Sequence, residues 1–487
     1  SFTYNTLDSS SKFYTESAYA ENGQVTADYD ETGENKTEYE YISGTNVVRT
    51  QKLPNGGKLS YGHDEDDTVT SITQSTEEGE ENSTQTHYTC GEITELVSGN
   101  NTVRYEYDHK RRVTAVHLNG TENYIANEYT ENETEAGETE YKVTATYVNG
   151  DTAVAVKDKH GNVLRTSYNE AEQIIAKYDK YDKPTEITDN VSKIRATYSY
   201  DSLNRLTKYE SEGYTENAET EKVTEDYEYS ATGKVTKKTV TVGNKSEEYE
   251  YIYKDGSTEE LQSISVGNIT VRPQTDKLGR NAGKELEIGD EKIAGEYIYY
   301  RKVGDHATNM PSAVYFGSVE NNEYVIRDNL KYEYDGCGNI VKIFSNGALA
   351  VRYGYDKLNR LIREDNKKFG KTWLYAYDNC GNIISKRETT FTLKTNVEEC
   401  EFTEVLYTYD GDKLIGYGNK TFAYDALGNP TTYRGKALQW NGRQLKSYNG
   451  VSFIYDGQGR RTSKGIISYT YDSENNIVKQ SNGLEFI

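Results

Sequence analysis

One short motif recurs along this 487-residue chain and constrains its fold more than any other feature: an aromatic residue, any residue, tyrosine, aspartate. Two aromatic residues at positions i and i+2 lie on the same face of a β-strand. An aspartate at the first position of a type I turn accepts hydrogen bonds from backbone N–H groups. The copies therefore predict a series of strands that each end in a tight turn. Nine strict copies occur, at 105–108, 198–201, 332–335, 353–356, 375–378, 407–410, 422–425, 453–456 and 469–472.

The residue three positions after the aspartate supports the turn prediction. Seven of the nine copies carry glycine or asparagine there, and these residues tolerate positive φ best. A left-handed residue at this point closes a hairpin with a bulge. Arg111 and Lys413 stand there in the other two copies, so we expect those turns to differ in length or type. The predicted structural turn residues are Asp201 with Asn204, Asp335 with Gly338, Asp356 with Asn359, Asp378 with Gly381, Asp425 with Gly428, Asp456 with Gly459, and Asp472 with Asn475.

The regularity of the repeat suggests how the chain is organised. Residues 331–487 form a regular array, with a degenerate copy, Trp-Asn-Gly-Arg, at 440–443. Residues 1–330 form a divergent, acidic array that is continuous with it, and the stretch near 279–310 is interpreted as an irregular insertion. No stretch has the caps and periodicity of a long amphipathic helix. The predicted fold is all-β: an antiparallel β-hairpin meander that curls into an open barrel or a spiral shell segment.

The amino-acid composition indicates which residues form the core and which partners are excluded. The 46 tyrosines outnumber the 10 phenylalanines and 2 tryptophans, so tyrosine must supply much of the core, and each buried hydroxyl needs a partner. With 56 Lys and Arg against 79 Asp and Glu, the net charge is −23. This charge argues against nucleic acid and anionic lipid as partners. No apolar run approaches the roughly 18 residues that a membrane-spanning helix needs.

The sequence predicts no catalytic, metal or cofactor site. The six histidines form no metal-binding motif, no GxSxG sequence occurs, and the four cysteines lack CxxC spacing. The recurring aspartates are better explained as turn formers than as a glycosidase pair. Asp64, Asp66 and Asp67 suggest calcium but lack a complete loop pattern. Cys337 and Cys380 share one turn position, which favours free thiols, although an even number of cysteines permits a bridge.

The extended motif, Tyr-x-Tyr-Asp-x-x-Gly/Asn-Arg/Asn-Leu/Ile, resembles the YD-repeat family, also called the Rhs-repeat family. It is nearly ideal at 353–361 (YGYDKLNRL) and 198–206 (YSYDSLNRL). The resemblance covers 331–487 closely and 1–330 more loosely. It implies a spiral of β-sheet that wraps into a hollow shell, in a secreted or cell-surface protein. Such shells enclose the C-terminal toxic domain of bacterial polymorphic toxins, form part of insecticidal toxin complexes, and carry the adhesion surfaces of teneurins. Carbohydrate binding has also been attached to the repeat.

From this resemblance we expect a non-enzymatic shell segment of a larger bacterial protein that carries a C-terminal toxin or effector domain. Its partner would be the rest of its own parent chain, a downstream core and that C-terminal domain. The final residues 484–487 parallel 451–454, which lead directly into a Tyr-Asp, so we expect a fragment cut before its next copy. The sequence contains no Asp-Pro, so self-cleavage is not assigned. The alternative is a cell-surface adhesion module that binds glycans or proteins through tyrosine-rich sheet faces.

Overall fold

The computed structural model describes residues 2–3, 12–13, 16–76, 81–215, 221–254, 260–276, 278–289, 291–303, 306–320 and 323–484. Three features of the sequence fall wholly or partly outside these ranges: a looser copy of the motif, Phe-Thr-Tyr-Asn, at 2–5, a run of acidic residues at 77–81, and the terminal segment 484–487. Contacts divide the chain into two compact units, each built from an early and a late stretch. Unit 1 contains Ser1–Arg104 and Asn268–Thr421, and unit 2 contains Tyr105–Gly267 and Phe422–Ile487. The predicted boundary at residue 330 rests on repeat regularity and stays a prediction.

Unit 1 is built from β-strands and one turn of 3-10 helix. Its early strands are β1 (Phe2–Thr3), β2 (Lys12–Phe13), β3 (Glu16–Tyr19), β4 (Val25–Tyr29), β5 (Lys36–Tyr41), β6 (Val48–Lys52), β7 (Lys58–His63), β8 (Val69–Ser75), β9 (Glu81–Thr89) and β10 (Glu92–Ser98). Its late elements are β25 (Ile269–Thr275), β26 (Asn281–Ile288), β27 (Glu291–Val303), β28 (His306–Glu320), β29 (Glu323–Tyr334), β30 (Ile340–Ser345), β31 (Ala348–Tyr355), β32 (Leu361–Asn366), β33 (Lys371–Tyr377), β34 (Ile383–Thr390), η1 (Val397–Glu399), β35 (Thr403–Asp410), β36 (Lys413–Tyr417) and β37 (Lys420–Thr421).

Unit 2 has the same construction, and β11 (Asn101–Tyr107) runs across the boundary into it. Its early strands are β12 (Val113–Leu118), β13 (Thr121–Glu133), β14 (Thr139–Tyr147), β15 (Thr152–Lys157), β16 (Val163–Tyr168), β17 (Ala171–Tyr178), β18 (Pro184–Asp189), β19 (Ile194–Tyr200), β20 (Leu206–Gly213), β21 (Val223–Tyr229), β22 (Val235–Val242), β23 (Lys245–Tyr253) and β24 (Leu261–Val266). Its late strands are β38 (Thr432–Tyr433), β39 (Lys436–Asn441), β40 (Gln444–Tyr448), β41 (Val451–Tyr455), β42 (Arg461–Lys464), β43 (Ile467–Tyr471) and β44 (Ile477–Gln480).

Successive strands pair antiparallel as a hairpin meander, as in β13 with β14 and β31 with β32. One parallel pairing joins β2 to β28, with Lys12 opposite His306. In the described part of the chain η1 is the sole helix, and no helix there is long and apolar enough to cross a lipid bilayer. The prediction of an all-β antiparallel meander is confirmed.

The register of the hairpins shifts at the tyrosine that precedes each turn. In β31 and β32 the pair Tyr353 and Glu364 is followed by Gly354 and Arg363, and then by Tyr355 with Leu361, so one residue is skipped. Such a bulge increases the local twist and leaves part of the backbone ladder unpaired. The same shift occurs before the turns at Asp201 and Asp378. The bulge is therefore a repeated feature of the motif.

The stretch 279–310, where the sequence pattern is least regular, lies within the ladder of unit 1. It covers β26, β27 and the beginning of β28. The β27–β28 pairing shifts register twice, between Tyr299 and Tyr300 and between Tyr300 and Lys302. Whether this stretch is an insertion relative to the repeat stays a prediction.

The buried core is small in both units. In unit 2 Ala196, Tyr209 and Val223 form a buried cluster against which Tyr198 and Leu206 pack. Among the described tyrosines, Tyr209 is the fully buried one, and most of the others are half-buried. Tyrosine thus supplies much of the apolar contact while its hydroxyl stays near a polar partner or water.

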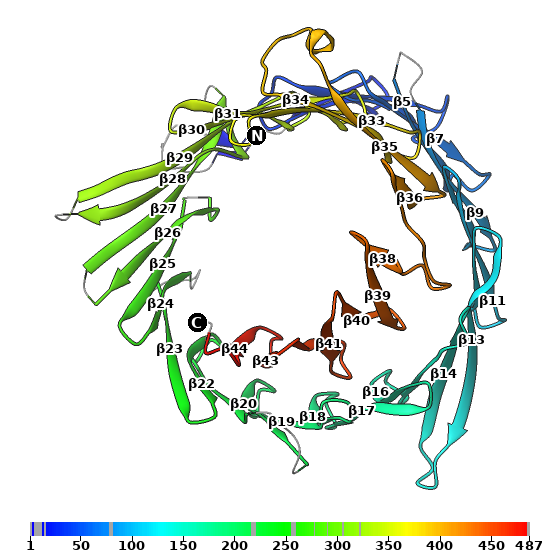
Figure 1. The fold of residues 1–487 in the computed structure, drawn as a ribbon, viewed down its shortest axis with the longest axis vertical. Helices are drawn as coiled ribbons and strands as arrows, with labels where there is room; N and C mark the ends of the chain where they lie inside the picture. Colours follow the sequence, from blue (N-terminus) through cyan, green and yellow to red (C-terminus); the bar gives the residue numbers. More distant parts are fainter. Residues whose placement is uncertain are drawn as a thin grey trace. The chain divides into compact units, whose positions relative to one another are not determined.

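Within each unit part of the late stretch runs beside early strands (Figure 1). In unit 2 the short strands β39–β44 lie beside the row from β16 to β22. In unit 1 the turns that follow β29, β31 and β33 contact the early hairpins. These contacts place the repeat turns against a second layer of chain.

Candidate functional site

The seven predicted turns share one geometry, which the turn at Asp356 illustrates. The Asp356 N–H donates to the Arg360 carbonyl at 3.0 Å, and the Asn359 N–H donates to the Asp356 carbonyl at 3.1 Å. Oδ1 of Asp356 accepts the N–H groups of Leu358 and Arg360 at 2.9 and 2.8 Å. One carboxylate oxygen therefore organises the turn. The residue three positions on has positive φ in every case: Asn204 (61°), Gly338 (82°), Asn359 (60°), Gly381 (84°), Gly428 (82°), Gly459 (85°) and Asn475 (68°).

The residue after the left-handed position binds the second carboxylate oxygen. Arg360 donates from Nε to Oδ2 of Asp356 at 2.6 Å, and Asn382 donates from Nδ2 to Oδ2 of Asp378 at 3.0 Å. In the turn at Asp201 these contacts, chiefly the N–H of Arg205, hold the pKa of the carboxyl below its usual range. The motif thus specifies a carboxylate whose two oxygens are both bound.

The two exceptional turns behave differently from each other. Lys413 follows a two-residue loop in which Asp410 pairs directly with Lys413 and Gly411 has a φ of 59°. The prediction of a different turn is correct there. It is wrong for Arg111, which adopts a φ of 62° in a turn of the common geometry. Three side-chain bonds to Asp108, from the backbone N–H groups of Lys110 and Arg112 and from Arg112 Nε, hold that turn and offset the strain.

Sequence reasoning missed further turns of the same kind in the early half. Asp158 and Asp276 accept the N–H groups of the second and fourth residues after them, and Gly161 and Gly279 follow with φ of 91° and 76°. Both lack the preceding Tyr-x-Tyr that defines the strict motif. The shorter pattern Asp-x-x-Gly followed by Asn or Arg would have found them.

The tyrosine immediately before most of the repeat turns has a defined hydrogen-bond partner. Tyr377 donates its hydroxyl to the Leu361 carbonyl at 2.6 Å, and Tyr355 donates to the Ile340 carbonyl at 3.0 Å. In both cases the acceptor is the first strand residue after the preceding turn, at the bulge. The hydroxyl thus satisfies a carbonyl next to the register shift, which explains tyrosine in place of phenylalanine. The same bond recurs from Tyr178, Tyr200, Tyr229, Tyr253, Tyr334 and Tyr409.

The turn tips of unit 1 contact its early hairpins. Asn55 donates from Nδ2 to the Lys357 carbonyl at 3.1 Å and to Oδ1 of Asn359 at 2.9 Å. Leu358, at the tip of the same turn, is 6% exposed, and the amide of Gln74 reaches its carbonyl. The turn residues therefore hold two layers of chain together as well as reversing the strand.

The turn tips of unit 2 meet buried carboxylates. The Gly457 N–H donates to Oδ2 of Asp189 at 2.7 Å. The Ser473 N–H and hydroxyl donate to the two carboxylate oxygens of Glu225 at 2.7 and 2.6 Å. Glu225 is fully buried and also accepts the Tyr227 hydroxyl, and Lys238 lies 3.5 Å away. Each carboxylate sits opposite the residue that follows a turn aspartate.

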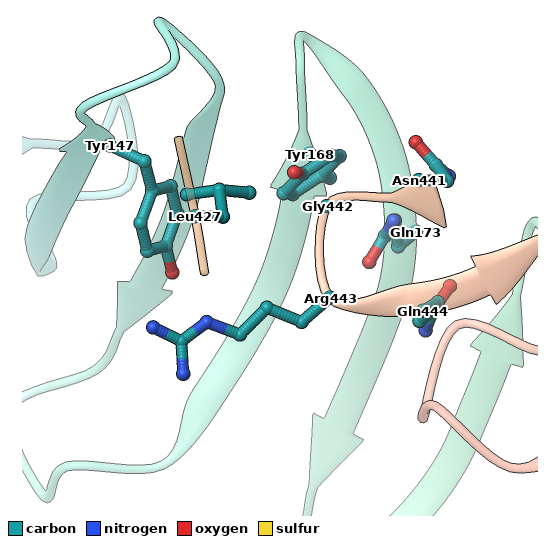
Figure 2. Close-up of a pocket in the computed structure, with 8 residues that line it drawn as sticks. All are labelled: Tyr147, Tyr168, Gln173, Leu427, Asn441, Gly442, Arg443 and Gln444. Atoms are coloured by element: carbon teal, nitrogen blue, oxygen red, sulfur yellow. The ribbon is translucent and has the colours of Figure 1, made fainter. Parts of the chain in front are cut away.

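A cavity of about 210 Å³ lies within unit 2, between early strands and late turns. Figure 2 shows the Arg443 side chain extending past Leu427 towards Tyr147, with Gln173, Gln444 and Asn441 on the other side. The Arg443 Nη2 donates to the Tyr124 hydroxyl at 3.1 Å, and that hydroxyl donates to the Leu427 carbonyl at 2.8 Å. The lining residues are Tyr147, Tyr168, Gln173, Leu427, Asn441, Gly442, Arg443 and Gln444.

The acidic cluster at 64–67 and the cysteines form no metal or disulfide site within the described residues. Asp64 uses Oδ1 to accept the N–H groups of Asp66 and Thr68, so it acts as a turn former. Within the described ranges no three His, Cys, Asp or Glu side chains gather as metal ligands, and no disulfide joins the cysteines. Cys380 packs its sulfur against Gly99, where a Cβ atom would clash.

Comparison with known proteins places the chain in a family. The family model described as the teneurin YD-shell matches residues 1–372. This chain belongs to the teneurin YD-shell family. The match includes the early array, where strict copies of the motif are few, so the YD-shell pattern extends through the divergent region.

One curated relative of this YD-shell chain is the double-stranded DNA deaminase toxin A of Burkholderia cenocepacia (strain H111). The two are 27% identical over 129 residues, which is 26% of this chain and 7% of that protein. The chain thus spans a small part of the relative's length.

Two solved structures resemble this YD-shell chain. The crystal structure of TcdB2-TccC3-TEV has a TM-score of 0.40 and 14% identity, over 95% of this chain and 28% of that one. The crystal structure of TcdB2-TccC3 has a TM-score of 0.33 and 12% identity, over 95% and 37% of the two chains.

Proposed function

We propose that this chain is a non-enzymatic wall segment of a larger bacterial YD-shell protein. The docking of late turns onto early strands carries the proposal. Four side chains of the motif make bonds that hold a hairpin or join two layers. They belong to Asp356, Asn359, Arg360 and Tyr377. A turn carboxylate with both oxygens bound has no free oxygen for chemistry. A wall of hairpins, in contrast, needs such a carboxylate at every turn.

The proposed task is to carry a C-terminal toxin or effector domain of the same parent chain. Family membership and the relative's description as a toxin support this task. The partner is then the rest of the parent protein, namely a downstream core and the carried domain. A secreted or cell-surface location follows from the same proposal.

Limited proteolysis of the full parent protein tests the carrier function. We expect the domain after the repeats to resist cleavage in the native protein. The variant Glu225→Ala should expose it, because the change removes the acceptor for Ser473 and leaves Lys238 without that partner. Glu228→Ala, at an exposed position of the same strand β21, is the matched control and should keep the protection. A carried domain that is cleaved equally fast in all three proteins would contradict enclosure.

A second candidate function is adhesion, favoured by one surface of unit 1. Strands β27–β29 present a tyrosine-lined hollow of about 810 Å³. Tyr297 meets the Tyr324 ring edge-on at 5.0 Å, Tyr299 meets Tyr315 at 5.3 Å, and Tyr299 is 51% exposed. Exposed rings of this kind can stack on the apolar faces of sugars or on side chains of a protein partner.

A glycan array distinguishes the two functions. Adhesion predicts binding that Tyr299→Ala abolishes and that Tyr433→Ala, at an exposed tyrosine in unit 2, leaves intact. Failure of the wild-type protein to bind any glycan or cell surface would leave the wall function as the remaining proposal.

A further inference from the structure

Arg443 differs from the arginines of the regular turns because no carboxylate in the described part of the chain forms an ion pair with it. Those arginines each form an ion pair with the aspartate four residues earlier, as Arg360 does with Asp356 and Arg460 with Asp456. Arg443 follows Gly442 in a two-residue loop of the degenerate copy, where Asn441 pairs with Gln444 and no turn aspartate exists. Among the described residues no carboxylate lies within ion-pair distance of Arg443.

Arg443 is exposed, so either solvent or a ligand can accept from the N–H donors that no protein group binds. The five N–H donors of the guanidinium make one described bond, to the Tyr124 hydroxyl. Asp151, a carboxylate that contacts the lining residue Tyr168, is already engaged by the Tyr168 hydroxyl at 2.7 Å and by the Asn169 amide at 2.8 Å. These bonds favour the ionised form and hold the pKa of Asp151 below its usual range.

The residues that line the cavity limit the kind of ligand that could bind beside the guanidinium. Leu427 and the ring of Tyr147 form an apolar side, with the Tyr147 hydroxyl directed towards the guanidinium, and the amides of Gln173 and Gln444 line the other side (Figure 2). The volume of about 210 Å³ equals that of roughly seven water molecules at about 30 Å³ each. This space suits a single ring with two substituents and is too small for an oligosaccharide or a folded partner.

We propose that this cavity binds a small ring-bearing organic carboxylate. The planar guanidinium of Arg443 takes the carboxylate through two parallel N–H bonds, a geometry that arginine favours. The ring lies against Tyr147 and Leu427, and a hydroxyl or carbonyl at its far end bonds the Gln173 and Gln444 amides. This ligand site is additional to the wall function and does not depend on it.

The test measures binding of 4-hydroxybenzoate to the full chain by titration calorimetry and ligand-observed NMR. The neutral analogue 4-hydroxybenzamide and inorganic phosphate serve as comparison ligands. We expect 4-hydroxybenzoate to bind, and the neutral analogue to bind about tenfold more weakly because it cannot form the charge-assisted pair. Arg443→Gln should weaken carboxylate binding about tenfold, and Arg443→Lys should recover part of the loss because it restores the charge without the bidentate fork.

The control is Arg434→Gln, which removes an exposed arginine that lies over the Tyr433 ring and does not line the cavity. It should bind as the wild type does, and a melting curve of each variant separates a binding defect from a folding defect. Three results would overturn the proposal: equal affinity for the acid and the amide, equal affinity of Arg443→Gln and wild type, or binding of phosphate that 4-hydroxybenzoate does not displace. Absence of binding by all three ligands would overturn it as well.

Discussion

Replacing Asp356 by alanine should destabilise its hairpin by about 3 kcal/mol. The change removes two backbone N–H acceptor contacts at 2.9 and 2.8 Å, each comparable to a helix N-cap worth about 1 kcal/mol. It also removes the 2.6 Å bond from Arg360. The Asp356 and Arg360 side chains are only 10% and 18% exposed, so the unpaired guanidinium should cost about 1 kcal/mol more, well below a fully buried pair.

Two variants separate these contributions. Asp356→Asn keeps an acceptor oxygen for the backbone and loses the ion pair, so it should cost about 1 kcal/mol. Asp378→Ala removes the same two backbone bonds in a turn where neutral Asn382 replaces the arginine. It should cost about 2 kcal/mol.

Hydrogen exchange followed by mass spectrometry measures the effect locally, because hairpins can open without global unfolding. A loss of about 3 kcal/mol should accelerate exchange of the peptide spanning 353–363 by roughly 150-fold, and 2 kcal/mol should accelerate its counterpart around Asp378 by roughly 30-fold. The turn assignment is refuted if Asp356→Ala exchanges within threefold of wild type. Equal effects of Asp356→Ala and Asp378→Ala would refute the contribution of the ion pair.

Four further outcomes are expected. Asn359→Val should destabilise the hairpin more than Asn359→Gly does, as measured by hydrogen exchange. Both variants lose the side-chain contacts, but only valine adds strain at a φ of 60°. Equal exchange rates of the two variants would contradict the strain. Tyr377→Phe should cost about 1 kcal/mol in denaturant unfolding by leaving the Leu361 carbonyl without its donor, and an unchanged midpoint would show that water replaces it. Glu225→Ala should lower the free energy of unfolding by about 3–5 kcal/mol, and Glu225→Gln should lower it less. Hydrogen exchange of β43 and β44 measures both effects, and unchanged protection of those strands would show that the contact is dispensable. Burial raises the pKa of many tyrosines, to about 12 for Tyr375, and the unfolded chain ionises near 10. The stability that buried tyrosines contribute below pH 10 should therefore be lost as the pH rises towards 12. Tyrosinate absorbance that rises before unfolding begins would contradict this direction of the pH dependence.

The repeat motif was sufficient to predict the local structure. Asp356 and Asn359 lie in the turn that their residue types favour, because turn formation depends on contacts within a few residues. The prediction of a different turn failed at Arg111, which stands where glycine or asparagine is expected. Hydrogen bonds to Asp108 hold this arginine in the common turn although its residue type disfavours positive φ. Local propensity is a preference that neighbouring contacts can outweigh.

The candidate cavity could not have been predicted from the sequence. Its lining comes from segments nearly 300 residues apart, such as Tyr147 and Arg443. The sequence does mark Arg443 as belonging to a copy without its aspartate, but only the fold shows that the guanidinium meets Tyr124. Sequence spacing carries no information about which distant hairpins share a surface.

The sequence by itself determined the hairpins, because each turn is encoded by its own aspartate, its left-handed residue and the tyrosine before them. The tertiary structure alone decided which turn meets which strand. Ser473 meets Glu225 and Gly457 meets Asp189, although any turn N–H could bond any carboxylate. The pairing follows from the accumulated twist and length of all the strands between them, a sum over the whole chain that no single repeat contains.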